Sequence, residues 1–185
     1  MENNLLLEAL VSESLALGAH KASIIPTRCM ELDASFRKLC EANACGMYGK
    51  CWMCPPDVGE IEELMASVAL YDHALVYQTV SALEDSYDFE GMQEAKKQHH
   101  KLSAALRDLF AQKGISISLH LGCGGCGACE VCAKRNGEVC RFPHLALPSL
   151  EAYGVNVSKL AATASMKYVN GQNTVTYFGA VLFCL

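Results

Sequence analysis

The residues of this chain most capable of chemistry are its cysteines, which are concentrated in two segments. Of eleven cysteines, five lie in residues 29–54 and five in residues 123–140. In the second segment a cysteine recurs at every third position: Cys123, Cys126, Cys129 and Cys132, with Cys140 after them. Packing gives no reason for such a repeat. A loop that presents a thiolate every third residue can wrap its sulfurs around one centre, so the sequence predicts a soft metal or a cluster.

The spacing in the second segment is typical of iron–sulfur ligation. Clusters are held by thiolates in a Cys-x2-Cys-x2-Cys run that is followed by a further cysteine near a proline. We predict the ligands Cys126, Cys129, Cys132 and Cys140, the last of which has a proline three residues further on. The gap before Cys140 is longer than in ferredoxins. Cys123 is a fifth candidate, so one of the five is surplus.

Zinc is the main alternative, because thiolates suit both metals. Structural zinc sites usually place two Cys-x2–4-Cys pairs well apart in the chain. Consecutive Cys-x2 steps without an intervening segment fit that pattern less well, so the spacing favours a cluster over zinc. A disulfide framework is a third interpretation, but its cysteines would be spread along a secreted chain, whereas these are clustered.

The first cysteine segment has a looser pattern and leaves a choice of role. Its best ligand set is Cys40, Cys45 and Cys54, with Cys51 or Cys29 as a candidate fourth ligand. If three thiolates hold a second cluster, one iron is open and can act as a Lewis acid on a substrate. If four hold it, electron transfer is the simpler role. The number of ligands therefore decides whether the protein is an enzyme, and the sequence leaves both possibilities open.

Other candidate site residues have simpler explanations. Gly122, Gly124 and Gly127 match the dinucleotide fingerprint Gly-x-Gly-x-x-Gly, but the expected second strand with its acidic end is missing. These glycines are better explained as residues that let a crowded loop turn and offer N–H groups to cluster sulfurs. His144 is the only histidine near enough to the cysteines to be an alternative ligand, and Cys184, on an apolar strand, is expected to be buried.

Composition restricts the class of protein. The 185 residues predict one domain, residues 1–185. A net charge of −5 argues against a nucleic-acid partner, which would need a basic face. No segment reaches the ~18 uninterrupted apolar residues of a membrane span, and the first residues lack the features of a signal peptide. We therefore expect a cytoplasmic protein that contacts neither membrane nor nucleic acid.

Hydrophobic periodicity predicts the elements that must position the cysteines. Helices are expected at residues 4–18, 33–39, from Asp57 onward, 88–113, 149–154 and near 158–165. Strands are expected at residues 22–26, 74–80 and 115–121, and a C-terminal hairpin at 166–185, turning near 170–173.

The order of these elements predicts an α/β fold with a small mixed sheet, packed helices and the C-terminal hairpin. Strand 74–80, helix 88–113 and strand 115–121 should form a parallel pair with a right-handed crossover. Each cysteine segment follows a predicted strand, 22–26 or 115–121. If those two strands are parallel, both cysteine-rich loops emerge at one sheet edge and face each other.

Four motifs in combination resemble a known family. They are Cys40-x4-Cys45-x2-Tyr48-Gly49, Cys54-Pro55-Pro56, Cys126-x2-Cys129-x2-Cys132-x7-Cys140-Arg-Phe-Pro143 and Pro148-Ser149-x-Glu151-Ala152-x-Gly154-Val155. Together they look like the predicted metal-binding proteins called domain of unknown function 2284, over nearly the whole chain. The resemblance implies metal or iron–sulfur binding in prokaryotic cytoplasm, often that of anaerobes. Cys123, Cys51 and Cys29 are additional to the pattern.

The leading expectation is a protein with one or two [4Fe–4S]-type clusters that passes electrons to or from a partner oxidoreductase. One alternative is an enzyme that uses an open cluster iron as a Lewis acid on a small molecule. The other is an interaction module stabilised by zinc. The sequence does not indicate the oligomeric state.

Overall fold

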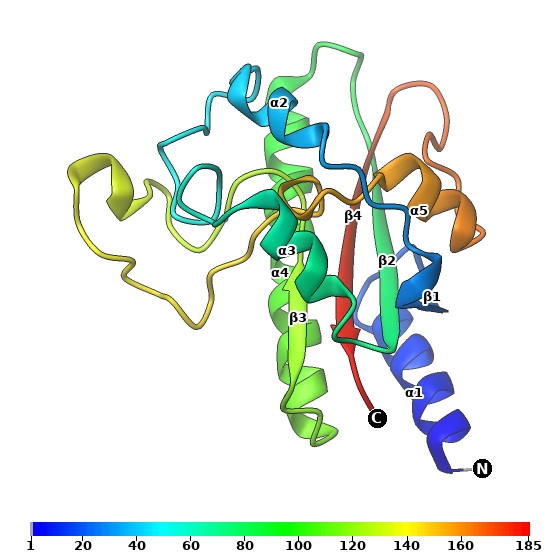
Figure 1. Cartoon of the computed structure of the whole chain (residues 1–185). Helices are drawn as coiled ribbons and strands as arrows, with labels where there is room; N and C mark the ends of the chain where they lie inside the picture. The colour runs from blue at the N-terminus through cyan, green and yellow to red at the C-terminus, as the bar shows by residue number, and fades with distance from the viewer. Residues whose placement is uncertain (1) are drawn as a thin grey trace.

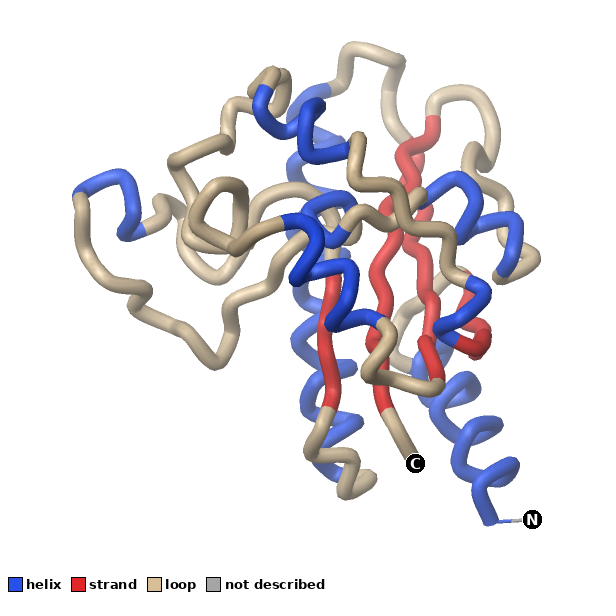
Figure 2. The backbone as a smooth tube through the Cα atoms, in the orientation of Figure 1, coloured by secondary structure: helices blue, strands red, loops and turns tan. Residues whose placement is uncertain are grey.

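The computed structural model describes residues 2–185, and its centre is a four-stranded antiparallel sheet in the order β1-β2-β4-β3 (Figures 1 and 2). The strands are Lys21–Pro26 (β1), His73–Ala82 (β2), Ser118–Leu121 (β3) and Thr174–Phe183 (β4). The two long strands β2 and β4 pair along their full length in the middle of the sheet. Both carry runs of buried apolar residues, as expected of strands that are covered on both faces.

The predicted parallel pair and the C-terminal hairpin are both wrong. β2 and β3 do run in the same direction, but β4 lies between them and pairs antiparallel with each. Residues 166–173 form an irregular loop with no strand, so β4 has no hairpin partner of its own. The reason is that β4 is apolar on both faces: Phe178 and Leu182 pack into one core and Val181 and Phe183 into the other. Only an interior position in the sheet buries both sets.

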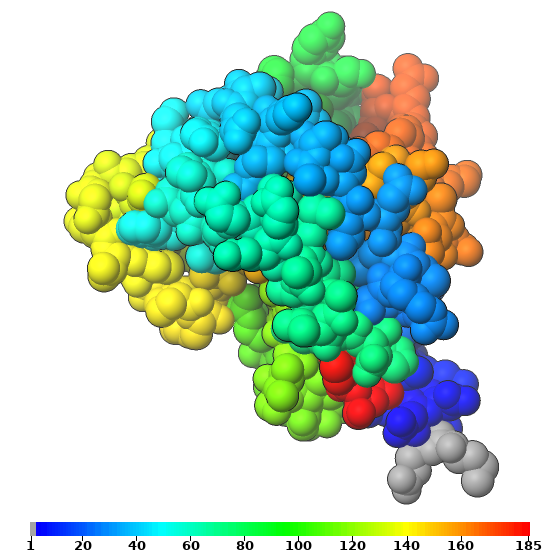
Figure 3. All heavy atoms as spheres, viewed as in Figure 1, coloured from blue at the N-terminus to red at the C-terminus, as the bar shows by residue number. Residues whose placement is uncertain are grey.

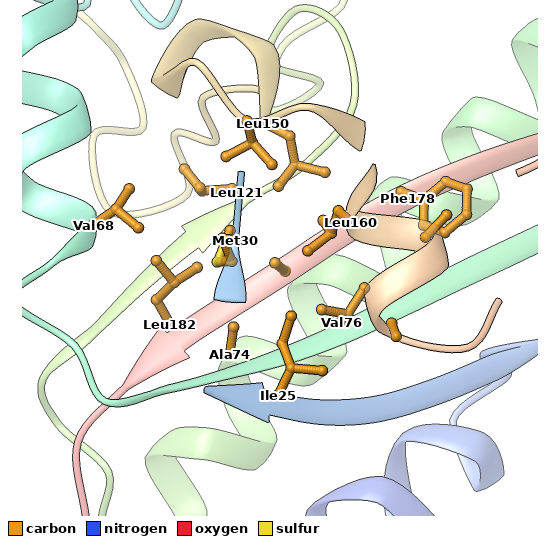
Figure 4. Packing of buried hydrophobic residues seen from close by; sticks show 14 of the residues in the cluster. Ile25, Met30, Val68, Ala74, Val76, Leu121, Leu150, Leu160, Phe178 and Leu182 are labelled. Carbon is orange, nitrogen blue, oxygen red and sulfur yellow. The ribbon is translucent and has the colours of Figure 1, made fainter. Parts of the chain in front are cut away.

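Helices cover the two faces of the sheet. One face is covered by α1 (Glu2–Ala16) and α4 (Phe89–Gln112), which pack on it through Leu10, Leu106 and Phe110. The other is covered by α3 (Ile61–Val68), the 3₁₀ turn η3 (Glu151–Tyr153) and α5 (Val157–Thr163). Figure 4 shows this second core, in which Met30, Val68 and Leu160 meet β-strand side chains. The fold is therefore α/β with a helical layer on each face.

The longest helix forms where the sequence predicts it. The Asp88 carboxylate accepts a hydrogen bond from the Gly91 N–H at 2.7 Å, which caps the first turn of α4. The predicted apolar stripe, including Leu102 and Leu106, is buried. Gly114, at φ +75°, ends the helix in the left-handed conformation that glycine tolerates.

The shorter elements differ from prediction in their bounds. α2 spans Phe36–Glu41, η1 spans Thr27–Cys29 and η2 spans Ala133–Asn136. The predicted helix at 149–154 is only the 3₁₀ turn η3, although the Ser149 hydroxyl accepts from the Ala152 N–H at 3.1 Å. The helix predicted from Asp57 begins at Ile61 instead, because Gly59, at φ +120°, interrupts the helical backbone.

The second cysteine segment leaves and re-enters the fold at one point. Gly122, just after β3, donates its N–H to the Pro148 carbonyl at 2.8 Å and accepts from the Leu150 N–H at 3.0 Å. Residues 122–148 therefore form an excursion that is closed at its base, which we call the 122–148 loop. It projects beside the β3 edge of the sheet (Figure 1).

The two cysteine segments do lie together, but for a different reason from the one predicted. β1 and β3 are the outer strands at opposite edges and run in opposite directions. After β1 the chain crosses one face of the sheet, where Leu32 bridges to Val155 and the Asp33 N–H donates to the Gly154 carbonyl at 2.7 Å. This crossing brings residues 40–58 against the 122–148 loop (Figures 1 and 3).

Candidate metal centre

Polar contacts join the two cysteine segments. The Trp52 indole N–H donates to the Glu138 carbonyl at 3.0 Å. The Lys134 ammonium forms an ion pair with the Asp57 carboxylate and lies 4.2 Å from the centre of the Trp52 ring. Both charged side chains are mostly buried, with 25% of Lys134 and 16% of Asp57 exposed. We call this group of Trp52, Asp57, Lys134 and Glu138 the inter-loop clamp.

Lys134→Met is expected to lower the free energy of unfolding by about 1–3 kcal/mol, because it leaves a mostly buried Asp57 carboxylate without its counter-ion. Urea denaturation of the variant and of the unchanged protein would measure the difference. Lys159→Met is the matched control, since Lys159 is exposed on α5 and has no ion pair within residues 2–185. Equal losses in the two variants would contradict a role for the clamp.

Cys51 lies where the two segments meet. Its side chain is fully buried, and the Cys54 and Cys132 thiols and the backbone of Met53 and Cys126 lie close enough to its sulfur to influence its pKa. A hydrogen bond with Cys54 is the largest cause of a pKa for Cys51 lowered to about 5, against the opposing effect of burial. The same bond, together with burial, raises the pKa of Cys54. Within this pair, hydrogen bonding favours the thiolate of Cys51 over that of Cys54.

Cys126 is also held by backbone donors. Its sulfur accepts from the Leu147 N–H at 3.4 Å and from the Ala128 N–H. Burial is the largest cause of its raised pKa, and the two N–H groups oppose it. Hydrogen bonds from backbone N–H groups to ligand sulfurs are a standard way for proteins to tune thiolate-bound metal. The 122–148 loop thus presents Cys126 in a setting suited to a thiolate ligand.

The three ligands predicted in the first segment line one cavity. Cys40 comes from α2, and Cys45 and Cys54 come from the turns that follow. The cavity has a volume of about 350 Å³ and is also lined by Tyr48 and Glu151. The backbone of the 122–148 loop closes one side of it. The fold therefore gives these three thiols a shared space large enough for a small molecule.

The four ligands predicted in the second segment are less closely gathered. Cys126 and Cys132 adjoin Cys51, and Cys129 lies with Cys132 on the side of Arg141. Cys140 is half-buried on the outer part of the loop. Across residues 2–185, no three cysteine, histidine or acidic side chains are close enough to hold one metal ion as they stand. To hold a metal, the thiols would have to draw together, and their ligand role stays a prediction.

The remaining cysteines lie away from this junction. Cys123 points toward the α4 side, and burial, opposed by the Lys96 ammonium, raises its pKa to about 12. Cys29 is exposed in η1. Cys184 is half-buried rather than buried, and its thiol donates to the Leu70 carbonyl at 3.4 Å. All cysteines are free, with no disulfide in the described part of the chain. His144 is exposed.

Two residues gain importance from the structure. The sequence treats Cys51 as one of two candidates for a fourth ligand, whereas the fold makes it the only fully buried thiol at the junction of the described segments. The two residues that separate it from Cys54, in a Cys-x2-Cys pattern, are the signal that favours it over Cys29. Lys96 on α4 places its ammonium against Gly124, where an added Cβ would lie 2.9 Å from it. The sequence does not predict this contact, because Lys96 lies on a helix that is distant from the cysteines in the sequence.

The α/β fold brings cysteines from two loops into one region, and a backbone N–H is directed at the sulfur of Cys126. The chain belongs to the family of predicted metal-binding proteins called DUF2284, whose model matches residues 23–183. No curated protein and no solved structure gives a significant match to the chain. Among the described helices, none is long and apolar enough to cross a membrane.

Proposed function

We propose that the protein binds a [4Fe–4S]-type cluster through the 122–148 loop and carries electrons to or from a partner oxidoreductase in the cytoplasm. The proposed ligands are Cys126, Cys129, Cys132 and Cys140. The observation that carries the proposal is the meeting of Cys51 with Cys132 and the Cys126 N–H, because it brings a buried thiolate from the first segment to the ligand loop.

The donor set fits a cluster chemically. All candidate ligands are thiols, which suit iron–sulfur centres. The Cys126 sulfur already accepts N–H groups of the loop, and such bonds help to set the reduction potential of a cluster. When bound, the cluster would supply one-electron chemistry. The chain itself would supply the sulfur ligands, the N–H donors and the shielding of Trp52 and Lys134 beside them.

The surface around the 122–148 loop supports a carrier. Val139 is 83% exposed, and Val131 and Phe142 are also exposed on the same loop. Arg135 and Arg141 are also exposed on this loop. An exposed apolar patch with charged neighbours is typical of a protein-docking site. A partner that covers it would lie next to the half-buried Cys129, Cys132 and Cys140, where electrons would need to cross only a short distance.

The cavity of the first segment favours a second candidate, an enzyme. Cys40, Cys45 and Cys54 line it with Glu151 and Tyr48. If these three thiolates held a second cluster, one iron would lack a protein sulfur and could act as a Lewis acid on a small molecule in the cavity. The carboxyl of Glu151 and the hydroxyls of Tyr48 and Ser149 are polar groups available there to orient a substrate.

The metal is tested first. Protein purified without oxygen should be brown, absorb broadly near ~400 nm and contain iron and sulfide, with about four irons per chain for one cluster and about eight for two. Colourless protein that contains zinc would contradict the cluster and favour the zinc-stabilised interaction module. In that case, substitution of the predicted cysteine ligands would remove zinc instead of iron.

Substitution in the two segments then separates carrier from enzyme. Cys40→Ser and Cys45→Ser should each lower the iron content by about four per chain if a second cluster is present, and leave it unchanged if the 122–148 loop holds the only one. Cys126→Ser should remove iron in either case. If the iron of a second cluster is lost only in variants of Cys40, Cys45 and Cys54, that cluster has three protein ligands. This outcome favours the enzyme.

A further inference from the structure

A second cavity lies on the other side of the 122–148 loop, between that loop and α4. Its volume is about 350 Å³. Helix α4 contributes Lys97, His100, Lys101 and Arg107, and none of the cysteines lines it. It is therefore separate from the cavity of the first cysteine segment.

The lining of this cavity is cationic. Lys97, Lys101 and Arg107 carry positive charge, and no carboxylate is among the lining residues. They lie along one face of α4, where like charges repel and weaken the helix slightly. Lys97 has a partner in Glu94 at 3.7 Å, on the exposed surface. Lys101 and Arg107 form no ion pair in the part of the chain that the structure describes. Positive charge is thus concentrated here in a chain of net charge −5.

Apart from His100 and Ser103, the rest of the cavity lining is apolar, and its walls fit closely. Ala104 from α4 and Ala128, Leu145 and Leu147 from the loop line it. Loop and helix are in tight contact, since a Cβ added to Gly127 would lie 1.7 Å from the His100 Nδ1. Cationic groups beside an apolar wall suit a ligand with an anionic head and an apolar body.

We propose that this cavity binds an organic anion, with a carboxylate, sulfonate or phosphate held by Lys101 and Arg107 and an apolar body against Ala104 and Leu147. The site does not depend on which metal the cysteines bind. It adjoins the metal loop all the same, because the Leu147 N–H donates to the Cys126 sulfur. An anion bound in this cavity would therefore contact Leu147, whose backbone N–H holds the predicted ligand Cys126.

Titration of the metal-loaded protein with 8-anilinonaphthalene-1-sulfonate tests the site, since this probe joins a sulfonate to an apolar ring system and fluoresces when bound. We expect saturable binding at one site per chain. Raising the ionic strength should weaken it, and benzoate and phenyl phosphate should compete with it. Lys101→Gln/Arg107→Gln should weaken binding at least about tenfold, because charge-assisted hydrogen bonds to the anion are lost.

Two further variants keep the result interpretable. Lys159→Gln/Lys167→Gln removes the same charge from exposed positions around α5 and should leave binding unchanged. Ala104→Trp fills the cavity without changing its charge and should also abolish binding. Unchanged affinity in Lys101→Gln/Arg107→Gln, or equal loss in the control pair, would overturn the proposal. Thermal unfolding of each variant verifies that weaker binding does not arise from a damaged fold.

Discussion

Cys51→Ser is expected to remove most of the bound metal, whereas Cys29→Ser should leave the metal content unchanged. Cys51 is fully buried and joins the Cys54 and Cys132 thiols across the junction of the two cysteine segments. Cys51 is not one of the four proposed ligands, so the expected loss is indirect. A serine hydroxyl is a smaller and harder donor than a thiolate, and it would disturb the contacts with Cys132 and the Cys126 backbone that hold the ligand loop. The buried hydroxyl would also lose hydrogen bonds that suit the larger sulfur. Iron and zinc per chain, measured by elemental analysis after anaerobic purification, report the effect.

The comparison with Cys29 and Cys123 makes this test specific. All three cysteines are additional to the family motifs, so the motifs alone predict one behaviour for all of them. The fold separates them, because Cys29 is exposed in η1 and Cys123 points toward α4. Metal loss in Cys51→Ser alone is the expected pattern. Full metal content in a folded Cys51→Ser variant would show that the thiol junction has no part in metal binding.

His99 is expected to make the protein unstable in mild acid. The ring is fully buried, its Nδ1 lies 2.9 Å from the Thr79 hydroxyl, and it stacks on Tyr77 with ring centres 5.2 Å apart. Burial is the largest cause of a pKa lowered to about 3, and the neighbouring His100 adds to it. Below about pH 6.5 the unfolded chain binds a proton at this histidine that the folded chain does not. Stability that is present above pH 6.5 is therefore lost as the pH falls toward 3.

The loss from His99 should reach about 2 kcal/mol at pH 5, at ~1.4 kcal/mol per pH unit. Urea denaturation at pH 7.5 and pH 5 measures it, and His99→Gln should show a pH effect smaller by that amount. His120, whose pKa burial lowers to about 4, contributes in the same direction to both proteins and cancels in the comparison. The same pH effect in both proteins would mean that His99 is already protonated in the folded state or accessible to water.

The elements with local signals could be predicted from the sequence, and those that depend on distant pairing could not. The cap at Asp88 and the stripe through Leu102 and Leu106 suffice to define α4. The position of β4 depends on residues far away in the sequence, since Val181 pairs with Leu75 on one side and His120 on the other. Its local neighbourhood suggests a hairpin instead. The interior position of β4 in the sheet is preferred only because it buries both faces of the strand at once.

Only part of the candidate site could likewise be predicted from the sequence. Residue types and spacing indicate thiolate chemistry and predict two ligand sets, whose role in metal binding stays a prediction. Spacing says nothing about the direction of each side chain, so Cys51 and Cys123 look alike in the sequence. The inter-loop clamp could not be predicted from the sequence either. The sequence around Asp57 predicts a helix cap, whereas in the structure Asp57 pairs with Lys134, which is far away in the sequence. Direction and long-range charge pairing are set by the fold.

The closed base of the 122–148 loop has a consequence for how such a protein can evolve. The loop enters and leaves through the hydrogen bonds of Gly122 with Pro148 and Leu150, next to one edge strand. Loops closed in this way tolerate insertion, deletion and exchange better than segments that run through a core. Lineages could therefore alter the number or spacing of cysteines between these two points, and so change the bound metal, while the sheet and its two helical layers are inherited intact.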